Sequence, residues 1–312
     1  MEQMNELSLT LLQKGMTTRD TSDVMRRFFG SSVSHTTVDQ LAKEFGQLRS
    51  TWENSPLEKV YKTVFADALQ VTVRRGNRYA KEAVYVLYGV TLENTRELLA
   101  LSLNPTESAE EWKEVFENLK ERGVETITLV VADGLQGLPG AIQSVFPATY
   151  FQVCVIHKIR NILRKTRPRD KAAVAKDLKE VFNNFETADT VTAAKDKLTA
   201  FLREWQDRYD FAKHFNEEII DHLFTYVSFS PDVRRMIYTT NSIENVNRAI
   251  RKATKNKLSF ESPDRLLDYI FVVIKDFESK HWQRPVWQYN GIIDLSEEKW
   301  ETQFILRSLF YW

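Results

Sequence analysis

Apolar and polar positions divide the chain into stretches with strand spacing and stretches with helical spacing. The clearest strand covers residues 127–132, an apolar run rich in β-branched side chains that is followed by Asp133 and bounded by Gly134 and Gly137. A run of this kind predicts a strand buried on both faces. The strand would therefore end on a carboxylate.

The next two elements bring further polar groups to the same place. We expect a short helix over residues 136–145 and a second buried strand over residues 150–155, which would deliver Cys154 and His157 to its end. Polar groups at the ends of core strands are how α/β scaffolds present chemistry to a cleft. Taken alone, Asp133 is more simply explained as the N-cap of the following helix.

Three further strands precede this region. Residues 60–73, 81–90 and 96–103 have the composition of β-strands and predict a meander. A helix then follows, with Ser108 and Glu111 forming a capping box. The order of elements predicts an α/β fold with a mixed five-stranded sheet and flanking helices, a layout that suits a ribonuclease-H-like fold.

Asp67 is out of place in the first of these strands. Aspartate is depleted in strands, and an unpaired carboxylate costs several kcal/mol when it is buried. Asp67 must therefore be paired, solvated or bound to a cation. For a single isolated residue, pairing or solvation is the commoner outcome.

Residues 4–50 have the spacing of three short helices separated by tight breaks, the first over residues 4–14. Ser34 is placed to cap the third helix. This order is typical of a helix-turn-helix unit, although an ordinary three-helix packing unit explains it equally well. In a DNA-binding unit the third helix would direct these side chains toward the major groove: His35, Thr36, Thr37, Asp39, Gln40 and Lys43.

Composition limits the class of protein. The chain has 312 residues, with 43 Lys+Arg against 43 Asp+Glu, so only a local patch of charge could indicate a nucleic-acid partner. Its single cysteine excludes a disulfide framework, and no apolar run has the length of a signal sequence or a membrane span. We expect a cytoplasmic protein that does not bind membranes.

A basic patch follows His157. Its side chains suit phosphate contacts, and a solvated helix face is the alternative. They are Lys158, Arg160, Arg164, Lys165, Arg167 and Arg169. Residues 172–229 then have helical spacing without a catalytic motif, and we expect Trp205 to lie in their core.

A late helix within residues 238–257 carries another set of polar groups. Its buried stripe consists of Ile243, Val246 and Ile250. Its polar edge consists of Glu244, Asn247, Arg248 and Arg251. An exposed i, i+4 ion pair between Glu244 and Arg248 is the ordinary explanation of this edge.

Asp67, Asp133 and Glu244 have a more specific explanation when they are taken together. The strands of the two aspartates are neighbours in a ribonuclease-H-like sheet, so their carboxylates can meet that of the late helix. Clustered carboxylates repel one another unless cations neutralise them. Oxygen ligands without thiolates suit two Mg²⁺ or Mn²⁺ ions, which can activate a water or a 3′-hydroxyl and stabilise the leaving oxygen at a phosphodiester.

The chain resembles the Mutator-type bacterial insertion-sequence transposases, members of the DDE superfamily, over about residues 5–285. Four segments carry the resemblance: VFADALQV, LVVADGLQG with FQVCVIHKIRN, the basic run after it, and YTTNSIENVNRAIRKATK. The resemblance implies metal-dependent cleavage of DNA at element ends, followed by transfer of the freed 3′-hydroxyl into target DNA. It also implies terminal inverted repeats as partners, a homodimer in a synaptic complex, and association with the nucleoid when bound.

The matching positions imply a role for each polar residue. Asp67, Asp133 and Glu244 match the metal-binding triad, His157 would position the scissile phosphate, and Cys154 and Asn247 would support the site. The expected DNA contacts are Arg248, Arg251, Lys252, Lys158, Arg160, Arg164 and Lys165, with Thr36, Thr37 and Lys43 in the helix-turn-helix unit.

The same resemblance implies a division into domains. A helix-turn-helix unit would occupy residues 1–50, and an all-α insertion at residues 171–230 would separate two parts of the ribonuclease-H-like core, residues 57–170 and 231–284. Residues 285–312 would form a packed C-terminal extension.

Two departures from the family pattern bear on these expectations. The family usually carries more chain ahead of the helix-turn-helix unit, so recognition of the terminal repeats is expected to be incomplete. Ala66 replaces a larger apolar residue before the first aspartate, a change that we expect to be tolerated.

Alternatives stay open. A truncated product that binds DNA without cutting it would act as a repressor or a relic, although all three acids are retained. A metal-dependent nuclease of the same fold is a third possibility. A zinc site on Cys154 and His157 would need two further ligands, and none has suitable spacing.

Overall fold

The computed structural model describes residues 10–11, 16, 18–29, 35–75, 77–184, 190–238, 241–255, 260 and 262–286. At its centre is a five-stranded sheet with the order β3-β2-β1-β4-β5. The strands are β1 (Val60–Arg75), β2 (Arg78–Thr91), β3 (Arg96–Asn104), β4 (Thr126–Ala132) and β5 (Tyr150–Val153). The first three strands form the predicted antiparallel meander, while β4 pairs in parallel with both β1 and β5. The mixed sheet predicted from the sequence is confirmed.

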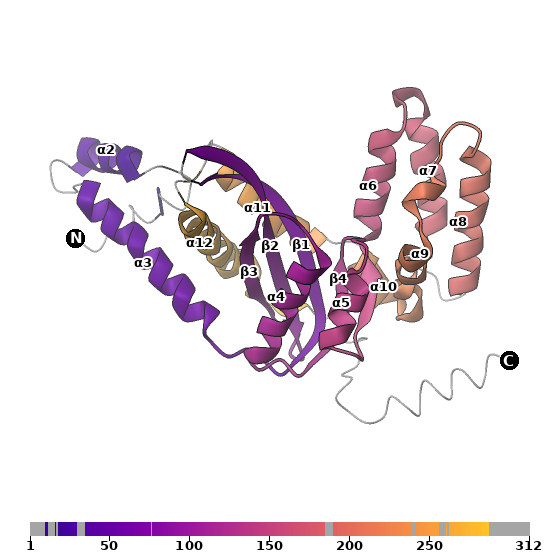
Figure 1. Cartoon of the computed structure of the whole chain (residues 1–312), viewed down its shortest axis with the longest axis horizontal. Coiled ribbons are helices and arrows are strands. Elements are labelled where there is room, and N and C mark those ends of the chain that lie inside the picture. Colours follow the sequence, from indigo (N-terminus) through magenta and orange to yellow (C-terminus); the bar gives the residue numbers. More distant parts are fainter. Residues whose placement is uncertain are drawn as a thin grey trace.

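Helices cover both faces of this sheet (Figure 1). One face carries α4 (Ala109–Glu121) and α5 (Leu138–Val145), and the other carries α11 (Asn241–Thr254) and α12 (Pro263–His281). Strand β4 is buried at every position after Thr126, as expected for a central strand with helices on both sides. The molecule is therefore of the α/β class around its core.

The start of α4 forms only half of the predicted capping box. Ser108 Oγ accepts the backbone N–H of Glu111 at 3.2 Å, as predicted. The Glu111 carboxylate instead accepts the hydroxyl of Tyr85 at 3.0 Å, and the same hydroxyl accepts the N–H of Ser108. The tyrosine thus replaces the reciprocal contact and ties the helix to β2.

Two predicted boundaries were wrong by a few residues. Strand β5 ends at Val153, because Cys154 is the N-cap of α6 (Val155–Lys165) and its Sγ accepts the N–H of His157 at 3.4 Å. His157 therefore lies in the first turn of a helix and not at the end of a strand. The third of the N-terminal helices, expected within residues 4–50, also ends later, since α3 (His35–Glu53) continues to Glu53.

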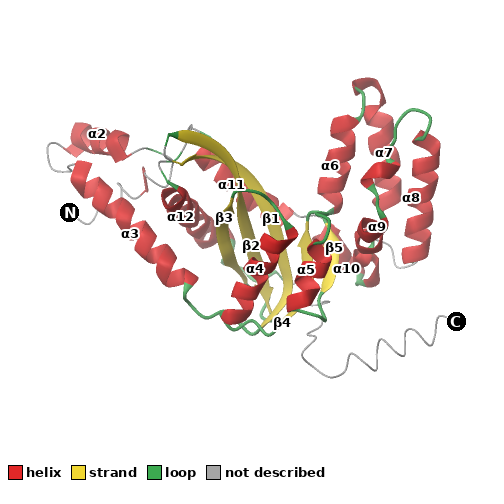
Figure 2. Cartoon of the chain, viewed as in Figure 1, coloured by secondary structure: helices red, strands yellow, loops and turns green. Residues whose placement is uncertain are grey.

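Helices form a separate lobe after β5 (Figure 2). Its α-helices are α6, α7 (Lys171–Phe182), α8 (Val191–Trp205), α9 (Glu217–Leu223) and α10 (Pro231–Tyr238). No strand occurs among the residues described between 155 and 238. Trp205 lies in the core of this lobe, as predicted, and its Nε1 donates to Asp177 at 2.9 Å.

A buried glutamine of β5 joins this lobe to the sheet. Gln152 donates through Nε2 to the carbonyl of Leu223 at 2.9 Å, and its Oε1 accepts the N–H of Tyr226 at 2.6 Å. Both polar ends of the amide therefore have hydrogen-bond partners inside the protein. These bonds hold residues 223–226, at the base of the lobe, against β5.

The N-terminal part described by the structure consists of α2 (Thr18–Phe29) and α3. The helix predicted over residues 4–14 lies outside the described residues except for Thr10 and Leu11, and so does the tail after Val286. None of the helices in the described ranges is both long and apolar enough to cross a membrane.

Arg122 holds the end of α3 against the sheet. Its guanidinium donates to the carbonyls of Trp52 and Ser55, each at 3.0 Å, and to that of Leu99, and it lies over the Trp52 ring at 5.2 Å. The guanidinium thus satisfies carbonyls from the end of α3, the following turn and β3 at once.

We expect Arg122→Gln to lower the free energy of unfolding by about 2–4 kcal/mol, because partly buried carbonyls lose their donor. Lys59→Gln, in an exposed pair with Glu125, is the matched control and should leave the free energy of unfolding nearly unchanged. Urea denaturation followed by tryptophan fluorescence would measure both. Equal losses in the two variants would contradict this account of Arg122.

Candidate active site

Asp67 lies in the middle of β1 and is only 6% exposed. Its Oδ1 accepts the N–H of Ala68 at 2.9 Å, and its Oδ2 accepts the side-chain amide of Asn247 from α11. Asn247 is itself buried, and its Oδ1 has no hydrogen-bond partner among the described residues. The out-of-place aspartate of the sequence is therefore paired, but only with neutral donors.

The environment of Asp67 disfavours its charge. Burial, and secondarily the negative charge of Asp133, raise the pKa of Asp67 to about 7. The positive charges of His157 and Arg251 act in the opposite direction and only partly compensate. A cation placed next to this carboxylate would remove most of the penalty.

Asp133 follows the last residue of β4 and forms an ion pair with Nδ1 of His157. The alternative assignment of Asp133 as a helix cap is wrong, because the N-cap of α5 is Gly137 in a left-handed conformation with φ of 79°. Burial opposes the charge on His157, but its hydrogen bonds with Asp133 and Cys154 outweigh this and raise the pKa of His157 to about 11. The environment of His157 therefore favours its protonated form at neutral pH.

Glu244 enters the site from α11. The predicted stripe of Ile243, Val246 and Ile250 is buried, and it sets the face of the helix so that Glu244 is only 8% exposed. The carboxylate binds both terminal nitrogens of Arg160, with Nη2 at 2.9 Å from Oε2, and its Oε1 is 4.0 Å from Nε2 of His157.

The ordinary i, i+4 explanation of Glu244 is therefore wrong. Its partner is Arg160, which lies 84 residues earlier in the chain, whereas Arg248 is exposed. Arg160 was expected to contact DNA, and in this structure it binds a carboxylate of the site instead.

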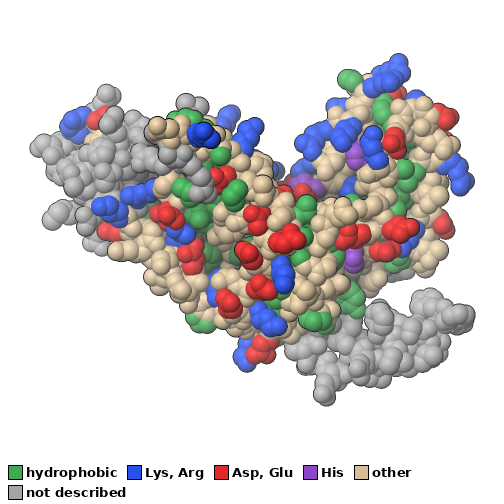
Figure 3. All heavy atoms as spheres, viewed as in Figure 1, with side chains coloured by type: hydrophobic (Ala, Val, Ile, Leu, Met, Phe, Trp, Pro, Cys, Tyr) green, Lys and Arg blue, Asp and Glu red, His purple; other side chains and the backbone are tan. Residues whose placement is uncertain are grey.

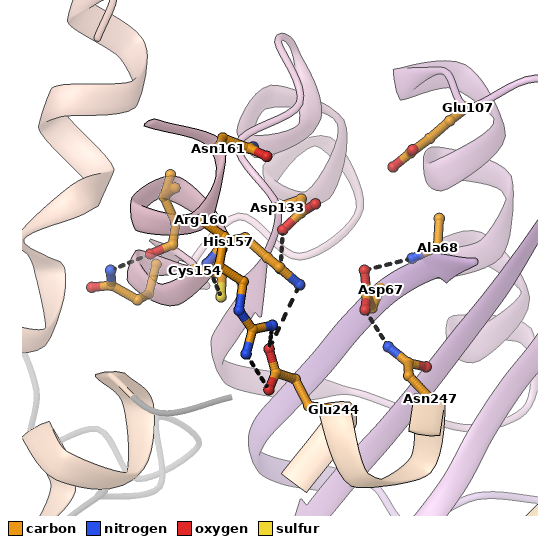
Figure 4. A network of polar contacts seen from close by, with 12 residues as sticks. Asp67, Ala68, Glu107, Asp133, Cys154, His157, Arg160, Asn161, Glu244 and Asn247 are labelled. Atoms are coloured by element: carbon orange, nitrogen blue, oxygen red, sulfur yellow. Dashed lines mark hydrogen bonds and ion pairs between the residues drawn. The ribbon is translucent and has the colours of Figure 1, made fainter. Parts of the chain in front are cut away.

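Figure 4 shows Asp133 beside His157, Glu244 turned toward Arg160, and Asp67 to one side of them, next to Ala68 and Asn247. His157 links Asp133 to Glu244, and the charge of Asp133 acts on Asp67. Ion pairs thus join Asp133, His157 and Glu244, whereas Asp67 bonds to Ala68 and Asn247 and is linked to Asp133 and His157 only through their charges, so a single site of all three acids stays a prediction.

A small pocket of about 210 Å³ opens beside Asp133. Its lining is Glu107, Asp133, Gly134, Leu135, Val153, Cys154, His157, Lys158 and Asn161. Lys158 was also expected at DNA, but it is half-buried and its Nζ donates to the carbonyl of His214 at 2.9 Å.

Glu107 is a fourth acid that the sequence reasoning missed. It accepts Nε1 of Trp112 at 3.3 Å, and burial together with the charge of Asp133 raises its pKa. The strand directions could have indicated it. β3 is antiparallel to β2, which is antiparallel to β1, and β4 is parallel to β1, so β3 and β4 run in the same direction. A residue just after β3 therefore reaches the same edge of the sheet as Asp133.

The remaining expected DNA contacts lie on three helices. Exposed basic side chains on α6 are Arg160, Arg164 and Lys165, and those on α11 are Arg248, Arg251 and Lys252. Lys43 is exposed on α3, whereas Thr36 and Thr37 belong to α3 with side chains outside the description. Figure 3 shows a hollow between the helical lobe and the sheet, with basic side chains along the α6 wall and acidic and histidine side chains at its floor.

The donor set fits a divalent cation that prefers oxygen. Asp67, Asp133 and Glu244 offer only carboxylate oxygens, as Mg²⁺ and Mn²⁺ prefer. Two of the three are balanced by side-chain cations in this structure, and Asp67 is buried with hydrogen bonds only from neutral groups. A cation there would relieve a cost that the protein itself compensates only in part.

The sequence matches the profile of the family described as "Transposase, Mutator family" over residues 1–284. The transposase for insertion sequence element IS905 of Lactococcus lactis subsp. lactis (strain IL1403) is 29% identical over 283 residues, which cover 91% of this chain and 71% of that protein. A probable insertion-sequence transposase of Corynebacterium diphtheriae is 31% identical over 278 residues, covering 89% and 80%. An ISRM3-like probable transposase of Sinorhizobium fredii (strain NBRC 101917 / NGR234) is 31% identical over 277 residues, covering 88% and 68%.

The burial of Asp67 predicts a pH-dependent gain of stability in Asp67→Asn. The carboxyl keeps its proton up to about pH 7 in the folded protein but only to about 3.8 in the unfolded chain, so stability falls as pH rises between these values and stays reduced above them. Removal of the charge should therefore stabilise the chelator-treated protein by about 1–3 kcal/mol at pH 8 and by much less at pH 5.

Thermal or urea unfolding in a chelator at the two pH values would measure this difference. Asp221→Asn, in an exposed pair with Lys195, is the control and should change stability by less than about 1 kcal/mol at either pH. A destabilised Asp67→Asn variant at pH 8 would show that the ionised carboxylate is favourable in the folded state, against this account.

Proposed function

The chain belongs to the Mutator family of transposases, and from that premise we propose that it cleaves DNA at the ends of an insertion element and transfers the freed 3′-hydroxyl into target DNA, with divalent cations at Asp67, Asp133 and Glu244. The observation that supports the proposal is the electrostatic linkage of these acids, since Asp133 raises the pKa of Asp67 and His157 lies between Asp133 and Glu244. They come from a central strand, a strand end and a late helix, and hydrophobic packing alone gives no reason to place them together.

We infer that the core is ribonuclease-H-like. Support comes from the strand order, from the parallel pairing of β1 with β4, and from the aspartates that these two neighbours carry. In this view the helices after β5 are an insertion that precedes the Glu244 helix, and α2 with α3 is a helix-turn-helix unit.

The cations supply the part of the chemistry that no side chain here can. Bound among the three carboxylates, two Mg²⁺ ions would polarise the scissile phosphodiester and lower the pKa of the attacking water or 3′-hydroxyl. The carboxylates would hold and orient them, and the burial of Asp67 and Glu244 would keep these interactions strong.

The residues of α6 serve the phosphate. The contact with Asp133 favours the protonated form of His157, whose imidazolium would donate to a non-bridging phosphate oxygen when the backbone enters. Arg160 has a side chain that is 55% exposed, which leaves its guanidinium free to turn from Glu244 toward a neighbouring phosphate. Both groups would then balance charge that develops at the phosphate.

The hollow between the helical lobe and the sheet would hold the DNA. Its α6 wall carries Arg164 and Lys165, and α11 carries Arg248, Arg251 and Lys252. Basic side chains on both sides of the acidic residues would contact phosphates on either side of the scissile bond, and the bond itself would lie at the acids. The DNA would include the terminal repeats and the target, and joining two ends would require two copies of the chain.

We expect Asp133→Asn to reduce Mg²⁺-dependent cleavage of element-end DNA at least about a hundredfold, because a cation ligand and the partner of His157 are lost together. The control is Asp221→Asn on α9, an exposed aspartate outside the site, which should keep the wild-type rate. Cleavage of a labelled duplex in Mg²⁺, with a chelator lane, would measure both. Unchanged activity in Asp133→Asn would refute the assignment of the site.

The same assay separates the alternatives. A protein that shifts the duplex on a gel but never nicks it would be a DNA-binding product without catalysis. Nicking without joined products would indicate a nuclease. Joined products that require Mg²⁺ or Mn²⁺ would support transposition chemistry.

The basic wall gives a second prediction. The double variant Arg164→Gln and Lys165→Gln should bind duplex DNA more weakly, and the slope of log affinity against log salt should fall by about 1–2, because each lost phosphate contact removes about 0.9. Lys59→Gln with Lys120→Gln removes the same charge from the opposite edge of the sheet and should leave the slope unchanged. Fluorescence anisotropy over a salt series would measure it, and equal slopes in all three proteins would contradict the proposed wall.

A further inference from the structure

The proposed chemistry has no use for the thiol of Cys154. This is the single cysteine of the chain, and it is buried at the N-cap of α6. Its Sγ accepts the backbone N–H of His157 at 3.4 Å and also interacts with the His157 side chain. The sulfur therefore lies in direct contact with the backbone and the ring of His157, where it can act as a metal ligand beside the imidazole.

Folding adds a third ligand to the pair that the sequence offers. Ligand atoms of Asp133, Cys154 and His157 all lie within 4.8 Å of one another. A carboxylate, a thiolate and an imidazole with one open position form a ligand set typical of zinc and a poor one for Mg²⁺. The small pocket of about 210 Å³ beside them is large enough for a water or another fourth ligand.

We propose that Asp133, Cys154 and His157 form a Zn²⁺ site that shares Asp133 with the site proposed for the oxygen-loving cations. Zinc bonds of about 2.0 Å to nitrogen and oxygen and about 2.3 Å to sulfur require the contact between His157 and Asp133 to open around the ion, and side-chain rotation within this group would provide the space. The proton now held between His157 and Asp133 and that of the thiol are released to solvent when the metal binds.

Occupation by zinc has a consequence that rests on the proposed function. Zinc would withdraw Asp133 from the carboxylate set and His157 from the scissile phosphate. Because thiolate prefers zinc, excess Mg²⁺ would not reverse this. Zn²⁺ would therefore inhibit cleavage through Cys154, as a metal sensor built into the active site.

The test uses Co²⁺ as a spectroscopic substitute for zinc in the full chain. Cobalt bound to a thiolate gives a charge-transfer band in the near ultraviolet, and with one cysteine in the chain that band can come only from Cys154. We expect the band in the wild type, its removal by Zn²⁺ but not by Mg²⁺, and its absence in Cys154→Ser and His157→Gln. His281→Gln, on α12, is the matched control and should keep the band.

Affinity for Zn²⁺, measured by competition with a coloured chelator, should fall at least about tenfold in Cys154→Ser, provided that circular dichroism shows an intact fold. No thiolate band in folded wild type, or a band that survives in His157→Gln, would overturn the proposal. Zinc binding without any Mg²⁺-dependent cleavage would leave the zinc site standing and remove the proposed function. Cleavage without a cobalt band would overturn the zinc site and leave the proposed function standing.

Discussion

An ionisable carboxylate buried in the central strand is the constraint on which the rest of this structure depends. Asp67 has apolar neighbours along β1, two neutral hydrogen-bond donors and a nearby like charge, and burial raises its pKa to about 7. A folded protein keeps such a group only where the surrounding structure outweighs its cost. The broad apolar sheet and the helices on both of its faces provide that surplus of stability.

Charge balance around the other two acids ties separate elements together. His157 and Arg160 are both on α6, and they reach Asp133 at the end of β4 and Glu244 on α11. The base of the same lobe is fixed by the buried amide of Gln152. The lobe is thus anchored by neutral hydrogen bonds that no ligand replaces, and by ion pairs that a cation or a phosphate can replace. Ligand binding can change the second set without loosening the first.

The sequence was sufficient for the elements because their signals are local. The β-branched run of β4 and the stripe of Ile243, Val246 and Ile250 fix which faces are buried, and with them the neighbourhood of Asp133 and Glu244. The sequence was not sufficient to predict the contact partners of the charged side chains. The pairing of Arg160 with Glu244 joins residues 84 positions apart, and three equally basic neighbours on α6 were indistinguishable by pattern. Glu107 was missed because its place follows from strand direction in the folded sheet.

The equal numbers of acidic and basic residues conceal a division of charge that bears on DNA binding. Carboxylates gather at the floor of the hollow and cations along α6, so a phosphate that approaches the floor meets repulsion unless the acids are neutralised (Figure 3). His157 and Arg160 neutralise them only in part, because no cationic side chain in the described part of the chain bonds to Asp67. Divalent cations would complete this balance and release Arg160 for phosphate in the same step. Metal binding and DNA binding at this site are therefore expected to strengthen each other, since each removes the charge that opposes the other.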